Sequence, residues 1–295
     1  MTAPADQVSP PAPQSALPDV VERLLACAGF VLDLDGTLAL GDALNHGLEP
    51  LPGAVEFTGW LNRRGVPYAV CTNGTTRTPD DYASAVRGMG FELDDELMVT
   101  PVTSAIDVLT RRGHRRVVAL GGDGVRIPLQ DAGLDLVEPV GRPQADAVFV
   151  GGYREFTMDV LEASCYAVWG GARLYTASQS PFFASRGGRA LGTSRAITAM
   201  IRSVTGCPTE VVGKPSRHAL RSAARRLGLP FRRLAVVGDD PDLEIAMARR
   251  GGALAIGVET GIANREAYDA LPPRRAAHLV MTGVHDLLKA LTDGR

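Results

Sequence analysis

The sequence has few cysteines, no long apolar run and no surplus of charge of one sign. Its 295 residues contain only four cysteines, Cys27, Cys71, Cys165 and Cys207, which are far apart and form no CxxC pair. The five histidines show no metal-ligand spacing either. These absences argue against a disulfide framework and a zinc site, and they predict free thiols in a reducing cytoplasm.

The charge pattern argues against nucleic-acid and membrane partners. The formal net charge is -2, the sequence pI is about 6.2, and no basic run is interleaved with aromatic residues. A nucleic-acid or anionic-membrane surface needs such a basic patch. Residues 1–18 have neither a basic start nor a long apolar run, so we expect a disordered tail rather than a signal peptide or membrane span. A small charged substrate remains compatible with this composition.

The chain is long and apolar enough for more than one domain, since 45% of its residues are hydrophobic. The segment 30–34 is apolar on both faces, as buried parallel strands are, and strand and helix patterns alternate after it. We predict an α/β protein with a Rossmann-like doubly wound parallel sheet as its core, formed by residues 19–99 and 209–295. A separate α/β unit, residues 100–208, is inserted into this core.

The elements expected from these patterns follow in chain order. Strands are expected at 30–34, 66–71, 116–120, 147–150, 173–176, 210–212, 234–237 and 253–257. Helices are expected at 20–28, 53–64, 79–88, 104–112, 125–132, 158–170, 193–205, 217–227 and 243–250.

Two carboxylates, Asp33 and Asp35, stand at the end of the apolar strand 30–34. At ~4 Å their repulsion would be of order 4 kcal/mol at an effective dielectric of ~20, so a cation, a proton or both must accompany them. This arrangement is typical of a metal-assisted reaction with a carboxylate nucleophile. The alternative is an Asp turn capped by Gly36.

Three further predicted strands end in polar residues. These ends carry Thr72 with Asn73, Lys214, and Asp239 with Asp240. Because strand ends of an open parallel sheet face one crevice, these groups are expected to converge with the first two acids. Carboxylates suit Mg²⁺, while hydroxyl, amide and ammonium groups suit a transferring phosphoryl group.

The four motifs resemble those of the haloacid dehalogenase (HAD) superfamily, subclass IIA, the NagD-like or 4-nitrophenylphosphatase-like branch. In family order they are Asp33-Leu-Asp35-Gly-Thr-Leu, Thr72-Asn73-Gly74, Gly213-Lys214-Pro215-Ser216 and Gly238-Asp239-Asp240-Pro-Asp242-Leu-Glu244-Ile. The resemblance spans about residues 30–288 and implies an aspartyl-phosphate phosphatase.

The resemblance implies a role for each core motif. Asp33 would attack phosphorus, and Asp35 would protonate the leaving alcohol and then activate water. Mg²⁺ would be held by the Asp33 carboxylate, the Asp35 backbone carbonyl and Asp239. The loop 72–74 would bind the phosphoryl oxygens, and Lys214 would offset charge on phosphate and nucleophile.

The sequence departs from the family pattern at two core positions. Relatives usually have a second Asp five positions after the metal Asp, whereas this chain has Glu244, one methylene longer. Glu244, Asp240 and Asp242, in that order, are therefore candidates for the outer metal contact. Gly74 stands where relatives often carry Asn, which removes a side-chain donor.

The inserted unit, 100–208, resembles the larger α/β cap of this family, which covers the crevice and selects the leaving group. In the segment Tyr175-Thr176-Ala177-Ser178-Gln179, small or neutral polar residues replace an Asn and an acid that relatives commonly show after the Thr. Arg186, Arg189 and Arg195 are candidates for substrate contact, with solvated arginines on a mobile loop as the alternative.

The predicted function is hydrolysis of a small phosphomonoester, such as a sugar phosphate, by a Mg²⁺-dependent cytoplasmic phosphatase. One alternative is a non-catalytic or weakly active binding or regulatory protein with the same fold. A haloacid dehalogenase is a further alternative, against which Asp35 and Asp239 argue. Relatives often pair through their caps, which implies a possible homodimer.

Overall fold

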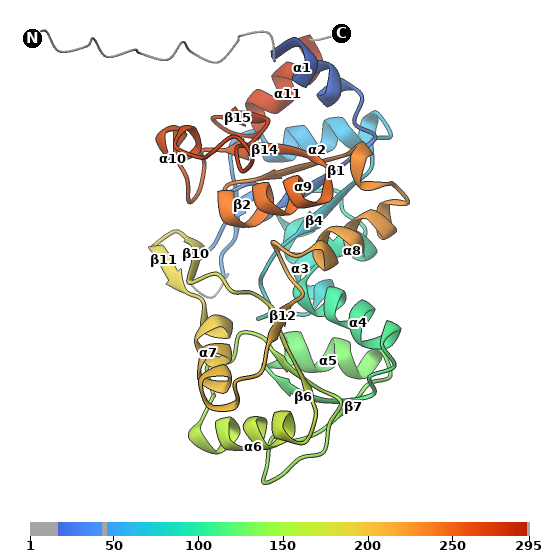
Figure 1. Ribbon diagram of the computed structural model, residues 1–295. Helices are drawn as coiled ribbons and strands as arrows, with labels where there is room; N and C mark the ends of the chain where they lie inside the picture. Colours follow the sequence, from blue (N-terminus) through green and yellow to red (C-terminus); the bar gives the residue numbers. More distant parts are fainter. Residues whose placement is uncertain (1–16, 43–45, 294–295) are drawn as a thin grey trace, which may run out of the picture.

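Two parallel β-sheets, one above the other in Figure 1, organise the protein. The computed structural model describes residues 17–42 and 46–293. The upper or core sheet has six strands, all paired in parallel, with β1 and β13 at its centre. In spatial order these strands are β15 (Leu279–Met281), β14 (Leu254–Val258), β13 (Leu234–Gly238), β1 (Gly29–Asp33), β4 (Tyr68–Cys71) and β5 (Met98–Val99).

Helices cover both faces of the core sheet because its strands are apolar on both sides. In β1, Phe30 and Leu32 pack on one face and Val31 packs on the other. The first face is covered by α1 (Leu17–Leu25), α2 (Ala54–Arg63), α3 (Pro79–Gly88) and α11 (Val284–Asp293). The second face is covered by α8 (Arg217–Leu227), α9 (Ala246–Gly251) and α10 (Arg265–Asp269).

The lower or cap sheet repeats this three-layer arrangement. Its five strands are β12 (Thr209–Val211), β9 (Arg173–Thr176), β8 (Ala147–Val150), β6 (Arg116–Leu120) and β7 (Asp135–Leu136). Helices α4 (Pro101–Arg111) and α5 (Asp123–Asp131) cover one face, and α6 (Met158–Trp169) and α7 (Thr193–Thr205) cover the other. The predicted fold class, a doubly wound parallel core with an inserted α/β unit, is confirmed.

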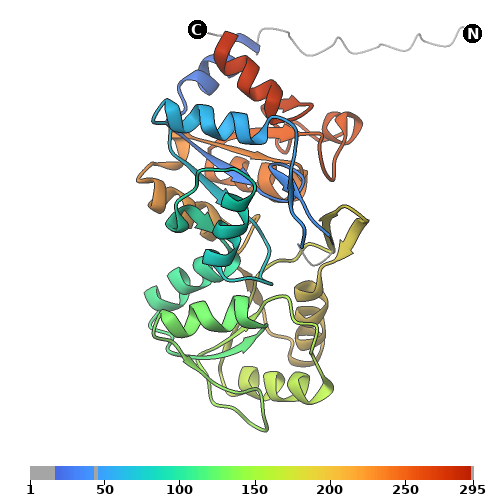
Figure 2. The same ribbon diagram turned by 180° about the vertical axis from the view of Figure 1, so that it is seen from behind.

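The carboxyl ends of the two sheets face each other (Figure 2). The Gly152 backbone N–H, just after β8, donates to Thr75 Oγ1 of the core at 2.7 Å. Asn73 Nδ2, just after β4, donates to Ser178 Oγ beyond β9 at 3.2 Å. The crevice at the strand ends of the core is therefore closed by the strand ends of the cap.

One predicted boundary is wrong. Residues 209–211 were expected to begin the returning core, but β12 pairs in parallel with β9 and is the edge strand of the cap sheet. The sequence pattern of a three-residue strand does not show to which sheet the strand belongs. Its pairing with β9 does. The chain returns to the core only after β12.

The predicted loop 180–195 contains a β-hairpin instead. Strand β10 (Phe182–Ser185) pairs antiparallel with β11 (Gly188–Leu191) across a two-residue turn. A second short antiparallel pair, β2 (Ala39–Leu40) with β3 (Glu49–Pro50), lies in the loop after β1.

Several helix boundaries also differ from expectation; α4, for example, begins at Pro101 rather than at residue 104. The helix expected at 243–250 begins with a π-helical turn, Pro241–Ile245, before α9. Helix α1 occupies residues 17–25 rather than 20–28, so it takes in the last two residues of the predicted tail. Residues 1–16 of that tail lie outside the described residues. No helix within the described ranges combines the length and apolarity needed to span a membrane.

Candidate active site

Polar residues gather where the central core strands end. Asp33 is the last residue of β1, Thr72 directly follows β4, and Asp239 directly follows β13. Because β13, β1 and β4 are neighbours in parallel register, their carboxyl ends adjoin. Lys214 reaches the same place from the segment after β12, so the structure brings together the four predicted motifs.

The Lys214 side chain is buried at the centre of this group. Its ammonium donates to Asp33 Oδ1 and lies 2.7 Å from Glu244 Oε1. Burial alone would lower the pKa of Lys214, but the Asp33 and Glu244 carboxylates raise that pKa well above its ordinary value. Lys214 is therefore held as a cation. Thr37 Oγ1 donates to the other oxygen of Asp33 at 3.1 Å.

Three buried carboxylates, Asp33, Asp239 and Glu244, place ligand oxygens within 4.8 Å of one another. Burial raises the pKa of Asp239 well above its ordinary value, and the charges of Asp33 and Glu244 raise it further. Burial likewise raises the pKa of Glu244 to about 7, against the lowering effect of Lys214. One lysine does not balance three carboxylates in a buried site, so the group favours an added cation.

The donors fit a hard divalent ion. All three groups offer carboxylate oxygen, which is the ligand type that Mg²⁺ takes. The chain also brings backbone close to Asp239: a Cβ at Gly36 or Gly261 would lie 2.5 or 1.9 Å from Asp239 Oδ2. The Ile262 backbone N–H donates to the same oxygen at 2.7 Å and fixes its position.

The three candidates for the outer metal contact have different surroundings. Glu244 belongs to the carboxylate cluster, and its longer side chain lies over Gly238, where a Cβ would come 2.1 Å from Glu244 Cγ. Asp240 accepts from the Asp242 backbone N–H at 2.8 Å, which leaves its carboxylate outside the cluster. Asp242 is 76% exposed and pairs with Arg275. Burial raises the pKa of Asp240 to about 6.

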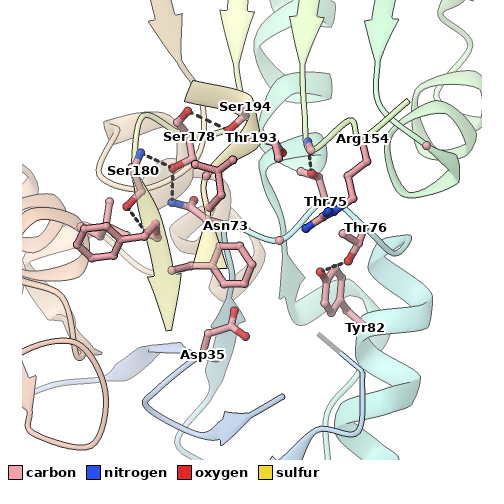
Figure 3. Close-up of a pocket in the computed structure, with 18 of the residues that line it drawn as sticks. Asp35, Asn73, Thr75, Thr76, Tyr82, Arg154, Ser178, Ser180, Thr193 and Ser194 are labelled. Carbon is pink, nitrogen blue, oxygen red and sulfur yellow. Dashed lines mark hydrogen bonds between the residues drawn. The ribbon is translucent and has the colours of Figure 1, made fainter. Parts of the chain in front are cut away.

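Asp35 lies on the open side of the site and lines a cavity of about 300 Å³ between core and cap (Figure 3). Thr72 Oγ1 donates to Asp35 Oδ2 at 2.9 Å and accepts from the Gly74 backbone N–H at the same distance. Thr72 therefore orients Asp35 toward the cavity, a positioning contact that the sequence did not predict.

The side chain of Asn73 also has a positioning contact besides its place at the cavity. Its Oδ1 accepts from the Lys214 backbone N–H at 2.8 Å, and its Nδ2 donates to the Lys214 carbonyl at 3.1 Å. A third bond, to Ser178, reaches the cap. Asn73 thus joins the lysine segment to the end of β4.

The side chain of Tyr82 explains why position 74 is a glycine. A Cβ at position 74 would lie 2.1 Å from the Tyr82 hydroxyl, so no larger residue fits there. Tyr82 comes from α3, lines the cavity, and shares a 3.0 Å hydrogen bond with Thr76. The hydroxyl occupies the space beside the loop 72–74 that an Asn side chain at this position would need.

The cap contributes a different set of groups to the cavity (Figure 3). They come from the loops after β8 and β9, from the β10–β11 hairpin and from the start of α7. Together with Gly122, which lies between β6 and α5, they are Gly152, Arg154, Glu155, Ser178, Ser180, Phe182, Phe183, Leu191, Gly192, Thr193 and Ser194.

The structure does not place the three predicted arginines among the residues that line this cavity. Arg186 pairs with Glu49 at 2.7 Å, Arg189 lies 4.2 Å from the ring centre of Phe182, and Arg195 donates to a backbone carbonyl. These contacts hold the hairpin and its surroundings. Arg186 lies in the two-residue turn of the hairpin, Arg189 in β11 and Arg195 in α7, and the predicted loop did not specify these positions.

Arg154 is the arginine that lines the cavity, and the sequence reasoning missed it. It follows the strand 147–150 and the pair Gly151-Gly152. The signal was present, because residues after a parallel cap strand lie at the same sheet edge as those after β9.

Comparison with known proteins gives the family. The model of haloacid dehalogenase-like hydrolases matches residues 30–135, and the HAD-hydrolase-like model matches residues 211–287. These segments contain all four motifs. The chain belongs to the haloacid dehalogenase-like hydrolases.

Individual relatives agree with this membership. The chain is 28% identical over 248 residues to the 5'-nucleotidase YutF of Bacillus subtilis, covering 81% of this chain and 89% of the relative. It is 28% identical to an acid sugar phosphatase of Staphylococcus epidermidis, covering 83% and 92%. A solved structure, the p-nitrophenyl phosphatase from Archaeoglobus fulgidus, is 26% identical with a TM-score of 0.79, covering 90% and 99%. The predicted HAD subclass IIA and the prediction of a hydrolase are confirmed.

Proposed function

We propose that this HAD hydrolase is a Mg²⁺-dependent phosphatase that cleaves small phosphomonoesters through a phosphorylated aspartate. The observation that carries the proposal is the buried Asp33–Lys214 ion pair beside Asp239 and Glu244, with Asp35 at the adjacent cavity. A nucleophile, a compensating cation and an acid in one crevice are what phosphoryl transfer needs.

Asp33 is the proposed nucleophile. Its carboxylate is fixed by Lys214 and Thr37, so an oxygen can approach phosphorus with little rotational loss. The new bond joins Asp33 oxygen to phosphorus as the bond from phosphorus to the leaving oxygen breaks. Lys214 then offsets charge shared between the nucleophile and the phosphoryl oxygens.

Asp35 is the proposed general acid and base. Thr72 holds its carboxyl at the cavity, on the side from which a leaving group would depart. It gives a proton to the leaving oxygen, and in the second half-reaction takes a proton from the water that attacks the phosphorylated Asp33. Each half-reaction therefore restores the protonation state that the other requires.

Asp33, Asp239 and Glu244 would hold Mg²⁺, with the Asp35 backbone carbonyl as a further donor. The bound ion supplies electrophilic stabilisation of the phosphoryl oxygens. Thr72, Asn73 and Gly74 are proposed to contact the same oxygens through their backbone and remaining hydrogen-bonding capacity.

The proposed substrate is a small metabolite ester, such as a sugar phosphate. The relatives named above are a nucleotidase, an acid sugar phosphatase and a nitrophenyl phosphatase, and all three names refer to small phosphate esters. A cavity of about 300 Å³ enclosed by two sheets accommodates a small leaving group.

The decisive experiment compares wild type with Asp33→Asn. With p-nitrophenyl phosphate and Mg²⁺, the variant should lose about 10⁴-fold or more of kcat, because an amide does not form the phosphorylated intermediate. Circular dichroism should show the same secondary structure in both proteins. Unchanged turnover in Asp33→Asn would exclude the proposed nucleophile.

The same assay separates the alternatives. Absence of wild-type turnover on a broad panel of phosphate esters, despite Mg²⁺ binding, would favour a binding or regulatory protein. Release of halide from a haloacid in the presence of EDTA would favour a dehalogenase. Phosphate release that stops with EDTA and returns with Mg²⁺ supports the proposal.

Two further features are proposed with this function. The four cysteines are all free, which fits the proposed cytoplasmic location. Pairing of two copies through the cap is proposed from the resemblance, and light scattering on the purified protein would measure the mass that tests it.

A further inference from the structure

We propose that Arg154 makes the enzyme selective for phosphomonoesters whose leaving group carries a second anionic group of the carboxylate type. The inference rests on the proposed phosphatase function and adds a substrate class and a specificity-determining residue to it. It follows from the position of Arg154, from its charge surroundings and from the remaining walls of the cavity.

Arg154 borders the cavity from the cap side. Arg154 and Asp35 line the same cavity, Asp35 from the core and Arg154 from the loop after β8. Figure 3 shows the Arg154 side chain extending downward from the cap, past Thr75 and toward Thr76, with Asp35 lower in the view. A leaving group that departs beside Asp35 therefore extends into the space that the guanidinium borders.

The charge of Arg154 is available to a ligand. In the portion of the chain described by the structure, no carboxylate forms an ion pair with Arg154, although Glu155 lines the same cavity. The three arginines near the hairpin, by contrast, all have contacts that occupy them. An arginine that borders a cavity without such a partner has its planar set of donors available for a carboxylate.

The other residues that line the cavity are apolar or carry neutral polar groups, apart from acidic residues. Phe182, Phe183 and Leu191 of the hairpin give the cavity an apolar side, whereas Thr193 and Ser194 of α7 offer neutral hydroxyls. Within the described residues, Arg154 is the only cationic side chain that lines it. A leaving group with an apolar body and an acidic end matches these walls, and Arg154 is the group to which the acidic end would bind.

The test uses two esters of the same shape, 4-carboxyphenyl phosphate and its neutral counterpart 4-carbamoylphenyl phosphate. Arg154→Gln should lower kcat/KM for the carboxy ester roughly tenfold, as expected for loss of a partly solvated charged hydrogen bond. The value for the carbamoyl ester should change by less than about twofold. Comparing each variant with wild type on the same ester cancels the different reactivities of the two leaving groups.

Two variants sharpen the result. Arg142→Gln removes an arginine that lies 4.6 Å from the ring centre of Tyr166 and is not part of the cavity lining, so neither ester should be affected. Glu155→Gln removes the negative charge from the lining and should raise kcat/KM for the carboxy ester by about two- to fivefold.

The outcomes separate this inference from the function on which it rests. Equal losses on both esters, or no loss on either, would overturn the role of Arg154 while leaving the phosphatase intact. If the wild type releases phosphate from neither ester nor from p-nitrophenyl phosphate, the phosphatase and the role of Arg154 both fall. A loss confined to the carboxy ester in Arg154→Gln, absent in Arg142→Gln, supports the proposal.

Discussion

The core side and the cap side of the cavity differ in the kind of polar groups that they carry. On the core side, Asp33, Lys214 and Glu244 form a buried chain of ion pairs. On the cap side, the lining consists of hydroxyls, aromatic rings and the adjacent Arg154 and Glu155. The reaction centre is thus built from paired buried charges, and the recognition surface mainly from neutral hydrogen-bonded groups and rings beside one arginine and one glutamate.

The physical reason lies in burial. A buried charge without a partner costs several kcal/mol, so the charged groups of the core side must be matched by one another or by an added cation. Arg154 and Glu155 on the cap loop after β8 are exposed, and exposed loop residues tolerate replacement, which suits a surface that selects a leaving group. Changes on the core side should therefore affect all substrates, whereas changes on the cap side should distinguish among them.

The largest effect among the following variants is expected for Lys214→Met, which keeps most of the length of the side chain and removes its charge. Without the cation between Asp33 and Glu244, charge on the nucleophile and phosphoryl oxygens is not offset. We expect kcat to fall about 10²- to 10³-fold for every ester, as measured by phosphate release at saturating Mg²⁺.

Lys289 provides the matched control, because it is the other of the two lysines in the sequence and is exposed on α11. Lys289→Met should retain wild-type kcat. A Lys214→Met enzyme that loses one ester and keeps another would contradict the division between the two sides.

An intermediate effect is expected for Glu244→Gln. The substitution removes one charge from the carboxylate cluster with Asp33 and Asp239. The Mg²⁺ concentration for half-maximal activity should rise roughly 10- to 100-fold, while much of kcat returns at saturating Mg²⁺. Mg²⁺ titration of enzyme first stripped with EDTA measures this shift.

Asp242→Asn serves as the comparison for this titration. Asp242 lies two residues away, is 76% exposed and pairs with Arg275, so its loss should leave the Mg²⁺ requirement unchanged. A larger shift for Asp242→Asn than for Glu244→Gln would reverse the assignment of the metal contact.

The smallest effect is expected in the pH dependence of stability, through a histidine at the edge of the core sheet. Burial, with Arg249 nearby, lowers the pKa of His278 to about 4, and the Ala255 backbone N–H donates to its Nδ1. An unfolded histidine has a pKa of about 6.5, so between pH ~6.5 and ~4 the unfolded chain binds a proton that the folded chain does not. The His278 contribution is present above pH ~6.5 and is lost as pH falls through this window.

Thermal unfolding at stepped pH measures this loss, which should amount to no more than a few degrees in Tm. His278→Asn keeps an acceptor for Ala255 and should flatten the pH dependence, whereas the exposed His285 should be replaceable by Asn without this change. Hydrogen exchange should report the acid-sensitive region in β14 and β15 rather than in the cap sheet. Equal acid sensitivity of the two sheets would contradict this location.

Much of the fold and of the reaction centre was predictable because their signals are local. The strands at 116–120, 147–150 and 173–176 and the helices at 79–88, 193–205 and 217–227 have the predicted bounds. Apolar periodicity and capping residues within each segment specify them, as Thr78 does for α3. Four motifs at strand ends also predicted the cluster around Lys214, because parallel strands place their ends at one edge.

The features that were missed depend on pairing between distant segments. Strand β12 belongs to the cap sheet because it pairs with β9, and residues 182–191 form a hairpin because β10 pairs with β11. The place of Gly74 becomes clear only beside Tyr82, eight positions later and on another element. Such contacts leave little trace in the order of residues because they are set by the packing of the whole chain.

The layered α/β class and the identity of the acids and the lysine at the reaction centre are specified by short segments, because periodicity and strand-end position are local properties. Packing of the two sheets determines which carboxylates share a site, how Glu244 fits over Gly238 in place of a shorter acid, and that Arg154 borders the cavity. Those outcomes depend on the juxtaposition of the two sheets, where distances between groups far apart in sequence decide which charges meet.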